Sequence, residues 1–399
     1  MAWVEQSGDN TWRVRYRRDD DTIGAIPGFT SSSAAQEYAN DMESDQRRGT
    51  WIDPAAGQTT LGEFVDNNDW LDSLDIDTRT ADNYRSMLHN HIRPRWGDTA
   101  LAEISNLKVQ AWKKKLRAKP LAQVTVDGIV KLLSLILGDA ADEKLIAANP
   151  IRARRRGRRR HSERRREKIW AQSDPVLRLA DQIAAYYGPG GAVMVVTGGW
   201  TGARWGELTG LQRPNLHLFD DDTGYIVVDP EIGALHESGA GKLWLGPPKT
   251  DESARTITLC PFNVRLLRAH LATHTHRHVF ISPDGDLHRR SNFSRRAMRP
   301  CADGNLTLDN PEIRLQPAAP GLTFHGLRHS HKTWMIEDAI PEIAQALRLG
   351  HVMGDKVRET YSHVAAAVEA RLLQCLQDRW DKAVLNSTVE FDTTWRQAA

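Results

Sequence analysis

The chain has 399 residues, enough for two or three domains with separate hydrophobic cores. With 40% hydrophobic and 26% charged residues it has an ordinary globular composition, and no apolar run approaches the length that crosses a membrane. The N-terminus lacks the apolar core of a signal peptide, so we expect a cytoplasmic protein with no membrane partner. Three cysteines without paired spacing indicate reduced thiols: Cys260, Cys301 and Cys375.

Residues 1–55 are predicted to form a small unit of three strands and a helix. The segment WVEQSGDNTWRVRYR is typical of two strands around an SGDN turn, and a third strand is expected near DTIGAIPGF, before a Ser-capped helix. Apolar residues in the second strand alternate with arginines, so one face of that strand is basic. These arginines either bind DNA phosphates or lie in solvent: Arg13, Arg15 and Arg17.

Residues 56–150 are predicted to be almost entirely helical. The segments TTLGEFVDNNDWLDSL, TRTADNYRSMLHNHI, NLKVQAWKKKL and VTVDGIVKLLSLILGDAADEKLI all have apolar residues at helical spacing. Pro94, Pro120 and Pro150 punctuate this region. Lysines of the third segment, among them Lys113 and Lys114, are candidate phosphate contacts, with a solvated helix face as the alternative.

Positive charge is concentrated in the run that follows, at 151–168. The whole chain carries only +2, but residues 152–168 contain ten Arg and one Lys against two Glu, a local net charge of +9. Such a run favours a polyanionic partner, although a solvated linker has the same composition and both descriptions can hold. The candidate DNA contacts here are Arg154, Arg155, Arg156, Arg158 and Arg159.

Residues 169–399 have the pattern of a mixed α+β domain. GGAVMVVTGGWTGARWGELTGL predicts a buried helix, a Gly-rich turn and the start of a second helix. Glu207 lies three residues after Arg204, one helical turn away, so its carboxylate can orient that arginine or its neighbours by a charged hydrogen bond. Three strands are then expected, at 224–229, 242–250 and 254–259.

A later stretch, FHGLRHSHKTWMIEDAIPEIAQALRLGHVMGDKVRETYSHV, concentrates cations, imidazoles and a phenol. Its first part predicts a helix with His325 and Arg328 projecting from the first turn, where an imidazole and a guanidinium can bind a phosphate. Gly350 suits the end of a second short helix, so His351 would begin a loop at a fixed place, and Tyr361 follows. Alone, each of these residues more often has a structural role, but four of them in this order and spacing favour a catalytic site.

These segments resemble the catalytic signature of the tyrosine recombinases, the phage-integrase family. TGARWGEL is similar to the family's T-G-x-R-x-x-E-L box, PPKTDESAR to its K-T-x-x-S-x-R hairpin, and the later stretch to H-x-x-R, L-G-H and a tyrosine. The gap from His351 to Tyr361 is ten residues where many relatives have nine, and Lys242 is a rival for the hairpin lysine. The matching residues are Arg204, Lys249, His325, Arg328, His351 and Tyr361.

The resemblance implies a role for each of these side chains. Arg204 and Arg328 would bind the nonbridging oxygens of a scissile phosphate, which Tyr361 attacks with His325 as base. Lys249 would protonate the departing 5′ oxygen and His351 would hydrogen-bond the phosphate. The product would be a 3′-phosphotyrosyl link, formed without metal or other cofactor, which a 5′-hydroxyl from another duplex can reverse.

The resemblance also implies the organisation of the chain and its partners. We expect an arm-type DNA-binding domain, a helical core-binding domain, an Arg-rich linker and a catalytic domain at 1–55, 56–150, 151–168 and 169–399. Expected partners are double-stranded DNA attachment sites, three further copies of the chain in a synaptic homotetramer, and an excisionase or other directionality factor. The protein is thus expected to be a nucleoid-associated, site-specific integrase of a mobile element.

Two alternative functions stay open. A DNA-relaxing topoisomerase would use the same chemistry on one duplex, although the arm-like N-terminal unit argues against it. A DNA-binding protein with a vestigial catalytic set is a second alternative, against which the full set of six residues argues.

Two features are left without an assigned function. RAHLATHTHRH places His270 and His274 at i,i+4 spacing, but no carboxylate or cysteine completes a metal site, so we expect surface histidines at a helix end. The segment AAAVEARLLQCLQDRWDKAVL is amphipathic, and its apolar stripe either closes the core of its own domain or docks on a neighbouring protomer. The stripe consists of Val368, Leu372, Leu376 and Trp380.

Overall fold

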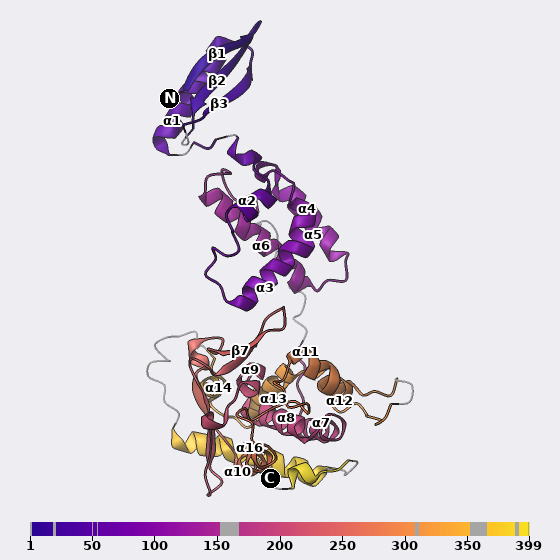
Figure 1. The fold of residues 1–399 in the computed structure, drawn as a ribbon. Coiled ribbons are helices and arrows are strands. Elements are labelled where there is room, and N and C mark those ends of the chain that lie inside the picture. Colours follow the sequence, from indigo (N-terminus) through magenta and orange to yellow (C-terminus); the bar gives the residue numbers. More distant parts are fainter. Residues whose placement is uncertain are drawn as a thin grey trace. The chain divides into compact units, whose positions relative to one another are not determined.

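The computed structural model describes residues 2–18, 21–49, 51–53, 55–151, 167–307, 311–351, 365–387, 391–397 and 399. The chain forms two compact units, Met1–His161 and Ser162–Ala399 (Figure 1). Three separate hydrophobic cores lie within these units, one of them among the N-terminal strands, one in the helical region and one in the C-terminal unit. The predicted fold class, a three-strand-plus-helix unit, a helical region and a mixed α+β domain, is confirmed. The exact domain boundaries stay a prediction.

The N-terminal strands form an antiparallel sheet in the order β1-β2-β3, with one helix against it. The elements are β1 (Ala2–Gly8), β2 (Thr11–Arg17), β3 (Ile23–Phe29) and α1 (Ser32–Arg48). Val14 and Tyr16 of β2 are buried with the small residues of α1, as the alternation in β2 predicts. Ser31 caps α1 by accepting a hydrogen bond from the amide of Ala34.

The predicted basic face of β2 is partly neutralised by its neighbouring strand. Arg13 Nε lies 2.8 Å from the Glu5 carboxylate of β1, and Arg15 Nε lies 3.4 Å from the same carboxylate. Arg17 is more exposed and lies 3.6 Å from Asp21. Any DNA contact by Arg13 or Arg15 would therefore have to compete with Glu5, which the sequence pattern did not indicate.

The helical region is built from α2 (Leu61–Asn67), α3 (Thr78–Met87), α4 (Arg93–Trp96), α5 (Asn106–Arg117) and α6 (Gln123–Asp142). The long helix α6 supplies its apolar face to the core, including Val126, Ile129 and Leu133. Of the two lysines predicted to contact phosphate, Lys113 is only 21% exposed and its Nζ lies 2.6 Å from Asp127. Lys114 is exposed.

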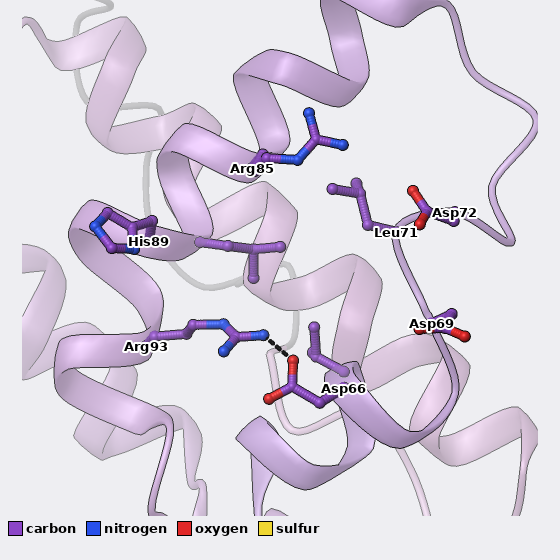
Figure 2. Close-up of a pocket in the computed structure, with 9 residues that line it drawn as sticks. Asp66, Asp69, Leu71, Asp72, Arg85, His89 and Arg93 are labelled. Carbon is purple, nitrogen blue, oxygen red and sulfur yellow. Dashed lines mark hydrogen bonds and ion pairs between the residues drawn. The ribbon is translucent and has the colours of Figure 1, made fainter.

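A π-helical segment, Leu88–Ile92, joins α3 to α4. Pro94 is the second residue of α4, and a proline cannot donate the backbone hydrogen bond that a continuous α-helix requires. Beside this segment lies a pocket of about 290 Å³ (Figure 2). Carboxylates line one wall of the pocket and cations the other, and Arg93 forms an ion pair with Asp66 across it. Three aspartates thus face two arginines in the pocket, and one ion pair joins its walls.

The C-terminal unit combines helices with two small antiparallel sheets. Strands β4 (Leu216–Leu218), β5 (Gly224–Val228) and β8 (Arg255–Thr258) form one sheet, and β6 (Ala234–Glu237) pairs with β7 (Leu243–Gly246) in the other. The helices are α7 (Ser173–Tyr186), α8 (Pro189–Thr201), α9 (Trp205–Thr209), α10 (Pro261–Ala272), α11 (Arg290–Phe293), α12 (Arg299–Asp303), α13 (Phe324–Glu337), α14 (Glu342–Leu349) and α16 (Ala366–Asn386).

The buried helix α8 lies at the centre of this unit. It contacts α7 and α13 extensively, and nearly all of its side chains are buried, as its uniformly apolar sequence predicts. At its C-terminal end, Trp200 contacts Phe262, Trp334 and Trp380 edge-to-face, with ring centroids 4.9–5.7 Å apart. The central helix thus fixes the position of the turn that follows it.

The amphipathic helix α16 packs against the core of its own unit. Leu372, Leu376 and Trp380 are buried there, and Val368 packs against the same core. The Leu376 carbonyl also accepts a 2.9 Å hydrogen bond from Trp200 Nε1. None of the helices that the structure describes has the length and hydropathy needed to cross a bilayer.

The segment K-T-x-x-S-x-R was predicted to be a hairpin, and this prediction is wrong. The strands on either side of it, β7 and β8, belong to different sheets and do not pair with each other. The strand predicted at 242–250 ends at Gly246, because Pro247 and Pro248 provide no backbone donors. A short 3-10 turn, Asp251–Ser253, then leads to β8.

The prediction of surface histidines at the end of α10 is wrong for His270. This side chain is buried, and its Nε2 donates to the Val279 carbonyl at 2.9 Å. His274 Nε2 lies 3.2 Å from the same carbonyl oxygen. The helical spacing of the pair indicated a common face correctly, but burial came from the following segment, which folds back over α10.

Acid is expected to destabilise the C-terminal unit through His270. Burial lowers the pKa of His270 to about 4, so below about pH 6.5 the unfolded state binds a proton more readily than the folded state. Stability is then lost as the pH falls from about 6.5 toward 4, at up to about 1.4 kcal/mol per pH unit. Denaturant midpoints at pH 7 and pH 5 should differ less in His270→Gln than in the wild type. The exposed His276→Gln is the control, and equal pH dependence in both variants would contradict this expectation.

Candidate active site

Arg204 is held at the start of α9 by the turn that ends α8. Gly202 adopts a left-handed conformation with φ 66°, and a Cβ there would lie 2.7 Å from Leu349 and 2.8 Å from His331. Only glycine therefore allows this close turn. From it, Arg204 Nη1 donates to Glu207 at 2.7 Å and to the Ser253 hydroxyl at 2.8 Å. Its Nη2 donates to the Gly350 carbonyl at 3.0 Å.

Arg328 approaches the same place from α13. Its side chain is 4% exposed, and it donates to the Gly202 carbonyl at 2.7 Å and to the Leu349 carbonyl. Burial, followed by the nearby charges of Arg204 and Arg255, lowers the pKa of Arg328 to about 9. The guanidinium thus lies beside other cations with carbonyl oxygens as its hydrogen-bond partners, an environment that a phosphate would stabilise.

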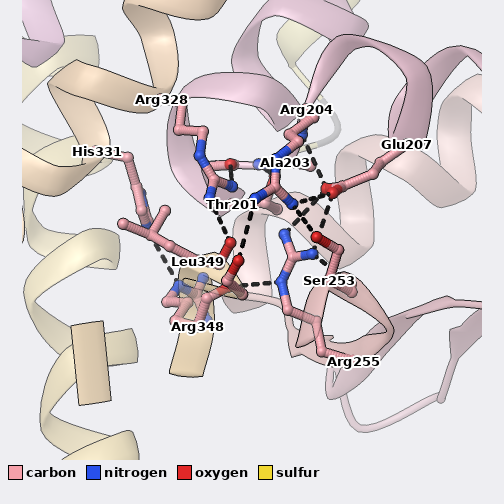
Figure 3. A network of polar contacts seen from close by, with 12 residues as sticks. Thr201, Ala203, Arg204, Glu207, Ser253, Arg255, Arg328, His331, Arg348 and Leu349 are labelled. Atoms are coloured by element: carbon pink, nitrogen blue, oxygen red, sulfur yellow. Dashed lines mark hydrogen bonds and ion pairs between the residues drawn. The ribbon is translucent and has the colours of Figure 1, made fainter. Parts of the chain in front are cut away.

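Three successive carbonyls at the C-terminal end of α14 each accept a hydrogen bond from a different arginine (Figure 3). The Arg348 carbonyl accepts from Arg255 Nε at 2.8 Å, and the carbonyls of Leu349 and Gly350 accept from Arg328 and Arg204. A helix leaves its last carbonyls without intrahelical donors and carries partial negative charge at this end. The end of α14 is therefore suited to hold guanidinium groups.

Glu207 is the carboxylate of this network. It is 4% exposed and accepts from Arg255 Nη2 at 2.9 Å as well as from Arg204. Burial alone would raise the pKa of Glu207, but the charge and hydrogen bonds of Arg255, followed by those of Arg204, outweigh it and keep the pKa low. Glu207 is therefore an ionised bridge between the two arginines.

Sequence reasoning assigned no function to Arg255 or Ser253. Both lie in the quoted segment K-T-x-x-S-x-R, and the two polar residues at fixed distances from the lysine were the available signal. In the structure the Ser253 hydroxyl accepts from Arg204, and Arg255 donates to Glu207. Their contribution depends on contacts with residues about 50 positions upstream, which spacing within the segment does not reveal.

The two predicted site histidines lie at exposed positions, on α13 and directly after α14. Reduced solvation, followed by the charges of nearby groups that include Arg328, lowers the pKa of His325 to about 4. The pKa of His351 is likewise lowered to about 4, first by reduced solvation and then by Arg328 and Arg204. Both imidazoles are therefore neutral at pH 7, and a neutral imidazole can accept a proton or a hydrogen bond.

Lys249 is exposed in the connection between β7 and β8. The hydroxyl of Thr250, its neighbour, lies 3.0 Å from the Ser253 hydroxyl that Arg204 binds, so the lysine is anchored close to the arginine network. The rival Lys242 lies at the other end of β7, in the β6–β7 turn, where its amide donates to the Ser238 hydroxyl at 3.0 Å. This geometry favours Lys249 over Lys242.

Some predicted site residues lie outside the described residues. These are Tyr361 and the linker arginines Arg154, Arg155, Arg156, Arg158 and Arg159. The five other members of the catalytic set, and Glu207, are described. Within the described ranges, no three His, Cys, Asp or Glu side chains gather as a metal site would require.

Comparisons with known sequences give integrases as relatives. The chain is 25% identical over 371 residues to the putative prophage phiRv2 integrase of Mycobacterium tuberculosis, covering 91% of each chain. It is 26% identical over 315 residues to the integrase of Mycobacterium phage L5, covering 73% of this chain and 79% of the relative. No family model matches the chain.

Comparisons with solved structures give the fold. The integrase of transposon Tn1549, solved with circular-intermediate DNA, superposes with a TM-score of 0.57 at 15% identity, covering 80% of this chain and 99% of that chain. A lambda integrase dimer on a core site superposes with a TM-score of 0.50 at 17% identity, covering 91% and 97%. The chain is therefore similar to phage and prophage integrases over most of its length, and its fold is that of the tyrosine recombinase integrases.

Proposed function

We propose that this chain is a site-specific DNA integrase that cleaves and rejoins DNA through a 3′-phosphotyrosyl intermediate at Tyr361. The observation that carries the proposal is the convergence of Arg204 and Arg328 on successive carbonyls of one helix end, directly before His351. Two guanidinium groups fixed side by side suit the nonbridging oxygens of one phosphate. The relatives of this chain are named integrases, and the Tn1549 integrase was solved with DNA. Both facts support DNA as the partner.

The chemistry requires stabilisation of charge and movement of one proton. As the Tyr361 phenolate oxygen bonds to phosphorus, charge grows on the nonbridging oxygens, which Arg204 and Arg328 would bind. His325, neutral at pH 7, would take the phenol proton, and Lys249 would deliver a proton to the departing 5′ oxygen. The phosphodiester energy stays in the phosphotyrosyl bond, so a 5′-hydroxyl can reverse the step and join a new strand.

An integrase of this kind would have DNA, further copies of itself and a directionality factor as partners. DNA attachment sites would be contacted by the N-terminal unit, the helical region and the linker, through residues such as Arg17 and Lys114 that remain exposed. Exchange between two duplexes requires four active sites, and hence a homotetramer on DNA. An excisionase or another directionality factor is proposed as an additional partner. We place the protein in the cytoplasm, on the nucleoid.

The nucleophile is tested with a nicked suicide duplex that carries the attachment site, in the presence of EDTA. The wild type should form a protein–DNA adduct that resists denaturant, because cleavage beside the nick releases a short strand and prevents religation. Tyr361→Phe should bind the duplex but form no adduct, since it lacks the attacking oxygen. Equal adduct formation by Tyr361→Phe would assign the nucleophile elsewhere. A wild type that binds the site without forming an adduct would favour the vestigial DNA-binding protein.

A topoisomerase and an integrase differ in the DNA substrate on which they act. A relaxing enzyme should remove supercoils from plasmids that lack any attachment site, whereas an integrase should join two duplexes that carry their sites. Recombination that depends on the site supports the proposal, and relaxation of any plasmid without strand exchange would contradict it.

A further inference from the structure

Two buried arginines outside the six-residue catalytic set surround the end of α14. Arg348 is 7% exposed, and so is the Arg255 side chain. Every nitrogen of both guanidinium groups donates to a protein acceptor, which leaves neither group available to a DNA phosphate. Burial also carries a desolvation cost that these hydrogen bonds must offset. Among the described residues, Arg348 forms no ion pair with a carboxylate. Such a buried cation requires another structural reason.

Arg348 connects α14 to three other elements by hydrogen bonds. Its Nε donates to His331 Nε2 of α13 at 3.0 Å, and its Nη2 donates to the Trp200 carbonyl of α8 at 3.1 Å. Its Nη1 donates to the Thr258 carbonyl of β8 at 3.3 Å. His331 Nδ1 lies 3.0 Å from the Gly199 carbonyl, so the ring holds its proton on Nδ1 and accepts on Nε2. This buried, neutral histidine therefore links Arg348 of α14 to the Gly199 carbonyl of α8.

Arg255 connects the same helix end to Glu207. It donates from Nε to the Arg348 carbonyl at 2.8 Å and from Nη2 to Glu207 at 2.9 Å. Its Nη1 donates to the Ser253 carbonyl at 2.7 Å. One planar guanidinium thus spans α14, α9 and the segment before β8, which a lysine ammonium cannot do.

The arginines proposed to bind phosphate depend on this arrangement for their position. Arg328 donates one hydrogen bond to the Leu349 carbonyl, and Arg204 donates to the Gly350 carbonyl, the Ser253 hydroxyl and the Glu207 carboxylate. Gly350 is itself confined, because a Cβ there would lie 2.7 Å from the Glu252 carbonyl. A shift of the end of α14 would therefore move both guanidinium groups together.

We propose that Arg255 and Arg348 are positioning residues, which fix the C-terminal end of α14 so that its carbonyls and Glu207 hold Arg204 and Arg328 in place for the reaction. This inference rests on the proposed function. It assigns Arg255 and Arg348 no contact with DNA, so they should govern the rate of the chemical step and leave DNA affinity unchanged.

The test measures the single-turnover rate of adduct formation on the suicide duplex and, separately, the Kd for the same duplex. Arg255→Lys and Arg348→Lys keep the charge but lose the fork of donors. A misplacement of about 1 Å can cost about 100-fold in rate, so we expect a 10- to 100-fold slower rate with Kd changed less than about twofold. Arg265→Lys, which alters a partly exposed ion pair with Asp222 in the same unit, should retain the wild-type rate.

A pH profile distinguishes positioning from general loss of structure. The charged groups that face Glu207 are Arg204, Arg255 and Arg328. Arg255→Gln removes the cation that contributes most to the low pKa of this buried carboxyl, so protonation of Glu207 would release Arg204 at a higher pH. The acid limb of its rate profile should move to higher pH, whereas that of Arg255→Lys should not. General damage would lower the rate equally at every pH.

The lysine variants test the positioning role, and the wild type tests the proposed function. Wild-type rates in both lysine variants would overturn the positioning role alone, and a Kd weakened in step with the rate would make the two arginines DNA contacts instead. A wild type that forms no adduct would overturn the proposed function and this role with it. If Arg348→Lys does not fold, the two Arg255 variants decide, because their rates and pH profiles differ only if Arg255 acts through Glu207.

Discussion

Arg328→Lys is expected to slow adduct formation on the suicide duplex by about 100-fold or more. The charge at position 328 is retained, so long-range attraction of DNA should change little. The lysine ammonium cannot donate to the carbonyls of Gly202 and Leu349 and also bind a phosphate in a fixed geometry. Stabilisation of the charge that develops in the transition state is therefore lost, while ground-state binding is kept.

The matched control is Arg371→Lys. Arg371 lies on α16 and also donates to two backbone carbonyls, those of Asp338 and Ala339, at 2.6 and 2.9 Å. It is not among the residues that contact Arg204 or Arg328. Single-turnover rates measured at saturating protein should be near wild type for Arg371→Lys. A comparable rate for Arg328→Lys would show that the bidentate guanidinium is not needed.

Leu376→Ala is expected to destabilise the C-terminal unit by about 2–5 kcal/mol. Leu376 is fully buried in α16, where its side chain helps to seal the core around Trp200 and Trp380. Truncation removes buried apolar surface and leaves a cavity that the close-packed aromatic rings cannot fill. At about 2–4 °C per kcal/mol, the unfolding transition of this unit should fall by roughly 4–20 °C.

Leu385→Ala on the same helix is the control, because Leu385 is 84% exposed. The same chemical change there should alter stability by no more than about 0.5 kcal/mol. Calorimetric scans of the full-length chain, with the transition of the C-terminal unit followed separately, give both values. A small effect of Leu376→Ala would contradict the packing of α16 on its own unit.

Local signals in the sequence were sufficient to predict the helices that carry the candidate site. The apolar run of α8, the glycine after it and the left-handed Gly350 at the end of α14 are all encoded by neighbouring residues. Arg204 and Arg328 were found because the resemblance names their spacing. In the structure they meet through contacts between residues 146 and 21 positions apart in sequence, with Gly350 and Leu349.

Pairings between distant segments were not predictable in the same way. The segment around Lys249 has the composition of a hairpin, but β8 pairs with β5 and β7 pairs with β6, a choice set by packing across the unit. His270 was expected at the surface because no carboxylate or cysteine completes a metal site with it, but the segment at Val279 buries it. Arg348 gave no signal and Arg255 only its place in K-T-x-x-S-x-R, because a buried arginine cannot be told from an exposed one without its partners.

The network around α14 also has a consequence for the charge balance of the folded protein. Four guanidinium groups, those of Arg204, Arg255, Arg328 and Arg348, gather around the end of α14, and among the described residues Glu207 is the carboxylate that forms ion pairs with two of them. Backbone dipoles satisfy their hydrogen bonds but do not cancel their charge. A DNA phosphate bound by Arg204 and Arg328 would add negative charge beside these cations. Substrate would then stabilise the folded state by mass action, so that the enzyme reaches its most stable form on its attachment site.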